Sequence, residues 1–294
     1  MKVIEKYNEE IKKAKENGRN IIACLINNEV KSLNYDLKEK DKLEFLDTTT
    51  KDGNRIYIRG ILYIMAKALH EIYPEALLSV NYQLSDAMFC RIDNMKITTE
   101  MIEKIKKRMQ EIIDADLEIR KVIMNKDEAS KFYANEKTLR GIAQIDNKQK
   151  ESVSLYYCED YYDYFFGVMP VSTGVVAIFD IVEFKDGFLV RYPSRKAPNV
   201  LTNHKTNKKL LATLEEYEDI HRVLEVDTLY KLNKEIKAGN TRELILLSEA
   251  LHEKKIANIA DDIAKRKNVK MVLIAGPSSS GKTTFARRLG VELR

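Results

Sequence analysis

The residues with the clearest chemical meaning lie near the end of the chain. They read Gly276-Pro277-Ser278-Ser279-Ser280-Gly281-Lys282-Thr283-Thr284, which fits the pattern G-x-x-x-x-G-K-T of a phosphate-binding loop. Glycines let such a loop wrap a phosphate, and consecutive backbone N–H groups point into it. In this pattern Lys282 reaches the β- and γ-phosphates, and the hydroxyl of Thr283 ligates Mg²⁺. The spacing therefore predicts binding of a nucleoside triphosphate with Mg²⁺.

The elements beside the loop must hold it in place. An apolar run over residues 269–275 predicts a strand before the loop, and a helix is expected after it. Lys282 is the predicted catalytic residue, because its ammonium group can neutralise charge that spreads over the phosphoryl oxygens. Pro277 has no N–H and can only shape the turn. The predicted phosphate-binding residues are Gly276, Ser278, Ser279, Ser280, Gly281, Lys282, Thr283 and Thr284.

Composition sets the broad class of the protein. The chain has 294 residues, of which 44% are hydrophobic and 32% are charged, with a net charge of +5. These values are typical of a globular protein with more than one domain. The three cysteines are scattered, which favours reduced thiols in the cytoplasm over a disulfide frame or a zinc site. No apolar run is long enough for a membrane span, and the N-terminus lacks a signal-peptide core.

The pattern along the chain predicts four segments of an α+β protein. Residues 1–50 form a small unit with a charged helix over 3–17 and short strands after it. The polar stretch Lys51-Asp52-Gly53-Asn54 predicts a boundary. Residues 51–204 form an α+β domain with helices over 59–72 and 99–114, several strands, and an Asp-Gly hairpin turn at 185–187. Residues 205–265 are a helical connector, and 266–294 begin a further domain.

Within the connector, caps predict two helix starts. Asp227 is a candidate N-cap for a helix that ends at Gly239, and Asn240 with Glu243 resembles a capping box. The four histidines lie apart and none completes H-E-x-x-H, so we expect helix-surface residues and not metal ligands. They are His70, His204, His221 and His252.

Two local compositions raise the question of nucleic-acid binding. The aromatic residues between Tyr156 and Phe166 could stack on bases, although we expect a packed sheet edge instead. Residues 187–210 carry six basic residues near one another, which could contact RNA phosphates or could be a solvated hairpin end and linker. The basic residues are Arg191, Arg195, Lys196, Lys205, Lys208 and Lys209.

The segment IAGPSSSGKTTFARRLGVELR, residues 274–294, resembles the start of a uridine kinase/phosphoribulokinase-type P-loop domain. Residues 21–46 resemble the second half of a TGS domain, the β-grasp module of threonyl-tRNA synthetase. Residues 55–200 resemble the editing domain of that synthetase, with matches at Met65-Ala66-Lys67-Ala68-Leu69 before Tyr73-Pro74 and at Gly167 with Pro170-Val171-Ser172-Thr173-Gly174. Together they are similar to uridine kinase-like proteins that carry TGS and editing-like domains.

The editing motif departs from its pattern at every ligand position. The resemblance implies an H-x-x-x-H pair on the first helix and a C-x-x-x-H pair later. Here the first pair falls on Arg59 and Tyr63, and the second on Phe165 and Met169. Arg and Phe are not ligands for a borderline metal such as zinc. We therefore expect no deacylation at this site and no zinc.

The sequence favours the N-terminal part of an ATP- or GTP-dependent nucleoside kinase that acts on uridine or cytidine. The acceptor site and the remaining catalytic groups are expected beyond Arg294, so we expect little kinase activity from this chain alone. The alternative is a non-catalytic RNA-binding or regulatory module related to threonyl-tRNA synthetase. A steep salt dependence of tRNA binding would favour this alternative.

Overall fold

The computed structural model describes residues 1–134, 141, 145, 151–203 and 206–294. The chain divides into two compact units, Met1–Leu211 and Ala212–Arg294. The first unit is α+β, as the sequence predicts, and the described part of the second is helical. No helix among the described residues has both the length and the apolar character needed to cross a membrane. The predicted boundaries at residues 50, 204 and 265 stay predictions.

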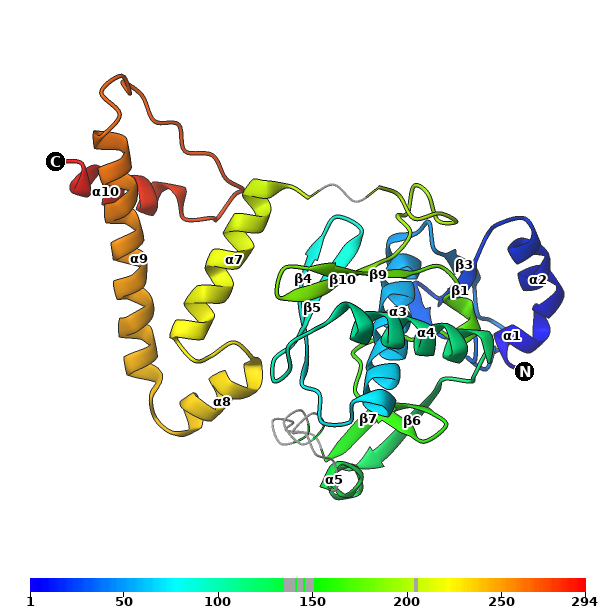
Figure 1. The fold of residues 1–294 in the computed structure, drawn as a ribbon. Coiled ribbons are helices and arrows are strands. Elements are labelled where there is room, and N and C mark those ends of the chain that lie inside the picture. Colours follow the sequence, from blue (N-terminus) through cyan, green and yellow to red (C-terminus); the bar gives the residue numbers. More distant parts are fainter. Residues whose placement is uncertain (135–140, 142–144, 146–150, 204–205) are drawn as a thin grey trace. The chain divides into compact units, whose positions relative to one another are not determined.

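The first unit begins with two short helices and a three-stranded antiparallel sheet of order β2-β1-β3 (Figure 1). The central strand is the apolar run IIACLI, in which all but one residue is buried. Asn27 and Asn28 form the turn after it with φ of 51° and 68°, values that asparagine tolerates. The elements are α1 (Val3–Lys6), α2 (Asn8–Glu16), β1 (Ile21–Ile26), β2 (Glu29–Lys31) and β3 (Leu43–Asp47).

A long central helix, α3 (Lys51–Ile72), begins eight residues before the predicted start at residue 59. The polar stretch at 51–54 forms its first turn. Thr50 explains the difference, because its side chain accepts a hydrogen bond from the backbone N–H of Gly53 at 3.1 Å. A cap one residue before the polar stretch thus converts a boundary signal into a helix start.

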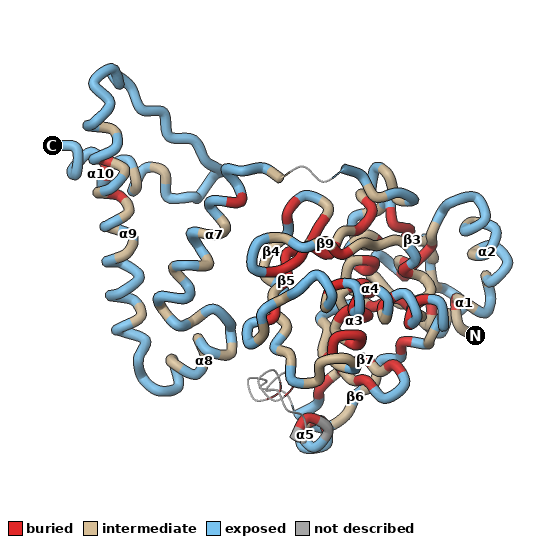
Figure 2. Tube along the Cα trace, in the orientation of Figure 1, coloured by how far each residue is buried: buried red, intermediate tan, exposed pale blue. Residues whose placement is uncertain are grey.

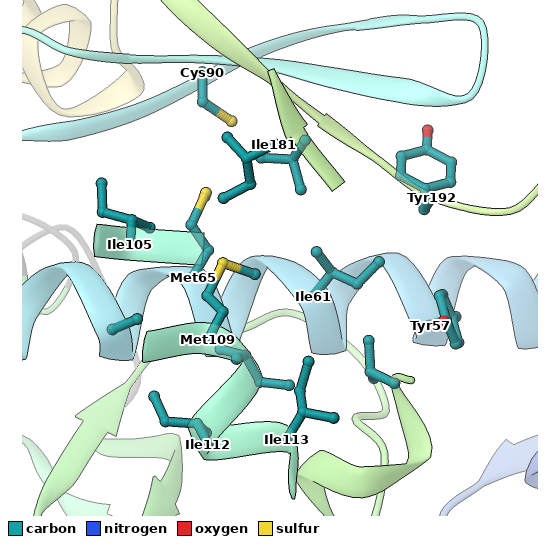
Figure 3. Close-up of a cluster of buried hydrophobic side chains, with 14 of the residues drawn as sticks. Tyr57, Ile61, Met65, Cys90, Ile105, Met109, Ile112, Ile113, Ile181 and Tyr192 are labelled. Carbon is teal, nitrogen blue, oxygen red and sulfur yellow. The ribbon is translucent and has the colours of Figure 1, made fainter. Parts of the chain in front are cut away.

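The largest core lies between α3, α4 (Thr99–Asp114) and a four-stranded antiparallel sheet of order β4-β5-β10-β9. Figure 3 shows Ile61 and Met65 of α3 close to Ile105 and Met109 of α4, with Ile181 of the sheet above them. Each such side chain contributes about 1.5–3 kcal/mol by its burial. The predicted hairpin turn at 185–187 joins the last two strands. The strands are β4 (Leu78–Leu84), β5 (Ala87–Ile92), β9 (Asp180–Phe184) and β10 (Gly187–Arg191).

A smaller sheet of order β6-β7-β8 packs on another face of α3. One face of this sheet places Tyr156, Cys158 and Tyr161 against Tyr63 of the helix. The other face is covered by α5 (Lys126–Ala134). A 3-10 turn, η1 (Thr173–Val175), follows the sheet and contacts α4. The strands are β6 (Arg120–Asn125), β7 (Ser152–Cys158) and β8 (Tyr161–Asp163).

The second unit has few buried residues, as Figure 2 shows by its mostly pale-blue trace. Its core consists of Ile256 and Ala260 packed against Leu289. The caps differ from the predicted ones: Thr228, not Asp227, accepts the capping hydrogen bond, from Lys231, and Asn240 makes no side-chain cap. The helices are α7 (Lys208–Val223), which starts in the first unit, α8 (Leu229–Lys237), α9 (Thr241–Ala264) and α10 (Lys282–Glu292).

The strand predicted over residues 269–275 is not formed, and this expectation was wrong for the described chain. The segment is irregular, with Met271 and Leu273 77% and 86% exposed. An apolar strand of a parallel sheet is stable only when neighbouring strands pair with it and helices cover both faces. The described residues of the second unit supply no such strand, so the segment stays unpaired.

Candidate functional site

The phosphate-loop motif forms a turn that leads directly into a helix. Gly281 has φ of +77°, a left-handed conformation that favours glycine, and α10 begins at the next residue, Lys282. The two ends of the loop approach each other: a Cβ on Gly276 would lie 2.8 Å from the hydroxyl oxygen of Ser280. The ammonium group of Lys282 donates to the carbonyl of Pro277 at 2.6 Å.

The loop residues are accessible to a ligand. Residues 276–281, Thr283 and Thr284 are exposed, and Lys282 is half-buried. A helix N-terminus that follows exposed backbone N–H groups is the arrangement that binds phosphate in proteins. The turn and the helix are thus in place, whereas the preceding strand that would fix the loop is missing from the described structure.

The four positions of the degenerate editing motif come together in space. Tyr63 of α3 packs its ring edge-on against Phe165, with ring centroids 5.7 Å apart, and lies in one buried cluster with Met169. The guanidinium group of Arg59, one turn earlier on α3, donates to the carbonyl of Val168 at 2.7 Å. The four positions, which were chosen from the sequence alone, therefore lie close together in the structure.

That site is filled by side chains. Tyr63 is 0% exposed and Met169 is 1% exposed. The hydroxyl group of Tyr63 lies 3.3 Å and 3.1 Å from the carbonyl oxygens of Tyr156 and Tyr161, so the two carbonyls take its one donor. The thiol of Cys158 lies in the same cluster, where burial raises its pKa to about 11 and keeps it protonated at neutral pH. The hydroxyl group of Tyr63 and the thiol of Cys158 are both buried from solvent.

A buried lysine that the sequence analysis missed lies beside this cluster. Lys67 of α3 has a side chain with 0% exposure, and its ammonium group pairs with Glu71 at 2.8 Å, Glu159 at 3.1 Å and Asp160 at 3.3 Å. Burial disfavours its charge, but these hydrogen bonds outweigh burial and raise its pKa. The three carboxylates could hold a metal ion by their spacing, yet the ammonium group of Lys67 already forms an ion pair with each of them. Its signal in the sequence was a lysine within the apolar run of a helix.

The two stretches considered for nucleic-acid binding behave differently. In the aromatic stretch, Tyr156 and Tyr161 are buried, which confirms the packed edge, but Phe166 is 84% exposed. In the basic stretch, Arg191 pairs with Asp180 at 3.3 Å and is not free. Arg195, Lys196, Lys208 and Lys209 are exposed, and Lys205 and His204 lie outside the described residues.

Comparison with known proteins bears on the first unit. No protein-family model matches the chain. A probable cytoplasmic threonine–tRNA ligase of Enterocytozoon bieneusi is 28% identical over 221 residues, which is 74% of this chain and 34% of that protein. The chain is similar to threonine–tRNA ligases. The enzymes of Desulforamulus reducens and Clostridium tetani are 26% and 28% identical over 53% of the chain and 25% of their own length.

This similarity supports the threonyl-tRNA synthetase-like part of the sequence interpretation. The chain spans only a quarter to a third of the length of these relatives. Ligase activity is a property of those whole proteins and is not assigned to this chain. The relatives reported above give no support to the nucleoside kinase interpretation, which rests on the loop motif alone.

Proposed function

We propose that the first unit is a non-catalytic RNA-binding module related to threonine–tRNA ligases. The observation that carries this proposal is the packed cluster of Tyr63, Met169 and the partly buried Phe165, which stands where the resemblance to the editing domain would place metal ligands. Similarity to tRNA ligases over most of the chain supports RNA as the partner. A module of this kind binds RNA without hydrolysing an ester.

Titration of tRNA against the full chain tests the proposal. We expect binding that weakens steeply between about 50 mM and about 200 mM salt, because each neutralised phosphate releases a counterion. Misacylated tRNA added to the chain should keep its ester bond. Absence of binding at the lower salt concentration would contradict the RNA-binding function. Rapid deacylation of the misacylated tRNA would show that the module is catalytic.

A second function is favoured by the phosphate loop. We propose that residues 276–284 bind ATP or GTP with Mg²⁺, with Lys282 on the phosphates and Thr283 as a metal ligand, as the first part of a nucleoside kinase that acts on uridine or cytidine. Support comes from the left-handed Gly281 and the helix that starts directly after it. The nucleoside acceptor would be bound by residues other than those described.

Calorimetric titration of Mg²⁺ with ATP and with GTP tests this second function. Lys282→Ala should abolish the heat of binding, because the only side-chain cation of the loop is lost. Lys270→Ala removes an exposed lysine of the preceding segment and serves as the matched control. Equal binding by both variants would show that the nucleotide, if bound, is not held by this loop.

A further inference from the structure

Arg59 is a half-buried cation without an acidic partner. Its guanidinium group donates one hydrogen bond, to the carbonyl of Val168, and no carboxylate within the described residues forms an ion pair with it. An arginine carries five N–H donors. Burial lowers the pKa of Arg59, and the positive charge of Arg55 acts in the same direction, whereas Tyr156 and Asp52 act in the opposite direction. Several donors of a charged group are thus left unpaired at a partly exposed position.

The fold holds this guanidinium group in a fixed place. Gly167 has φ of +97°, and a Cβ at this glycine would lie 3.0 Å from Cζ of Arg59 and 3.1 Å from each Nη. The group therefore lies flat against a backbone that has no side chain. The hydroxyl group of Tyr156 donates to the carbonyl of Gly167 at 2.5 Å and fixes the same peptide. A preorganised guanidinium fork matches the oxygens of a phosphate.

Two neighbours complete a surface with Arg59. Arg55 lies one turn earlier on α3, and its own pairing with Asp52 is long, at 3.6 Å, between side chains that are 57% and 48% exposed. An exposed pair of this kind is weak. The two arginines and the one aspartate together carry a net charge of +1. Phe166 precedes Gly167 in the chain and is 84% exposed. An exposed ring on the residue next to Gly167, which Arg59 contacts, offers a stacking face to a base.

We propose that Arg59, Arg55 and Phe166 form a binding surface for a nucleoside phosphate, in which Arg59 holds the phosphate and Phe166 stacks on the base. The phosphate can belong to an RNA strand or to a free nucleotide. The inference deepens the proposed RNA-binding function by naming its surface. The backbone of Gly167 and Val168, against which the guanidinium group of Arg59 lies, would form one wall of the anion site.

Fluorescence anisotropy with a labelled single-stranded RNA of about twelve nucleotides tests the surface on the full chain. Arg59→Gln keeps a donor for the Val168 carbonyl but loses the charge, and we expect RNA binding about tenfold weaker with a salt slope lower by about one. Phe166→Ala removes an exposed ring, so the fold is unaffected, and binding should weaken about fivefold or more. Lys96→Gln, which removes an exposed lysine elsewhere in the unit, should bind as the wild type does.

Competitors distinguish the source of the phosphate. Displacement of the labelled RNA by a nucleoside monophosphate, lost in Arg59→Gln, supports the surface and assigns it to free nucleotides. Displacement by unlabelled RNA alone supports it and assigns it to RNA. Displacement by polyglutamate as effective as by RNA overturns phosphate recognition.

The Arg59 surface and the RNA-binding function can be refuted independently of each other. If wild-type RNA binding persists unchanged in both Arg59→Gln and Phe166→Ala, this surface is refuted while RNA binding stands. If the wild type binds a nucleoside monophosphate through Arg59 but binds no RNA, the surface stands and the RNA-binding function falls.

Discussion

Replacement of Tyr63 by alanine tests whether the cluster around this residue is part of the core. The ring of Tyr63 is 0% exposed and packs edge-on against Tyr161 and Phe165, with centroids 5.4 Å and 5.7 Å away. Loss of a buried ring of this size leaves a cavity and costs about 3–5 kcal/mol. Loss of the hydroxyl hydrogen bond adds about 1 kcal/mol. The sum is a large part of the 5–15 kcal/mol, roughly, by which a domain is stable.

Urea unfolding followed by near-UV circular dichroism measures this change, because most of the 15 tyrosines lie in the first unit. Tyr63→Phe should lose about 1 kcal/mol only, since it keeps the ring and removes the hydroxyl group. Phe166→Ala is the control: its ring is 84% exposed, and a surface change of this kind costs less than about 0.5 kcal/mol. A loss below about 1 kcal/mol for Tyr63→Ala would mean that the site is an open cleft and that the reasoning from burial is wrong.

Three further outcomes are expected. Gly53→Ala should lower the melting temperature strongly, because its Cβ would lie 2.0 Å from the backbone carbonyl oxygen of Asp47; an unchanged melting curve would contradict the tight helix start. Burial raises the pKa of Glu71, but the hydrogen bonds of its two cationic partners outweigh burial and lower it. The ionised Glu71 therefore stabilises the fold above its unfolded pKa of about 4.3, and this stabilisation is lost as the pH falls through its folded pKa. Between about pH 7 and pH 3, the urea midpoint of Glu71→Gln should fall less than that of the wild type. Burial raises the pKa of Cys24 and Cys158 to about 11, so a thiol reagent at neutral pH should modify them only after unfolding, and rapid reaction in the folded protein would disprove their burial.

Helix and strand positions were predictable where they depend on local periodicity, whereas β4, β5 and α5 were not predicted. The stripe of Ile105 and Met109 predicted α4 at its observed bounds, and the Asp-Gly turn predicted the hairpin of β9 and β10. Prediction also failed where groups outside the local pattern decided the element. Thr50 extends α3 across a polar stretch, and the lack of a strand partner leaves residues 269–275 without regular structure.

The sequence by itself determined which residue types stand at the candidate sites. Arg59 and Phe165 are not ligands for a borderline metal, and Gly281, Lys282 and Thr283 fit the pattern of a phosphate-binding loop, because these properties belong to residue types and spacing. Only the tertiary structure decided that Tyr63 is buried against Tyr161 and Phe165 and that Lys67 lies among three carboxylates. Those facts depend on contacts between α3 and segments about 90 residues away along the chain, which no local pattern records.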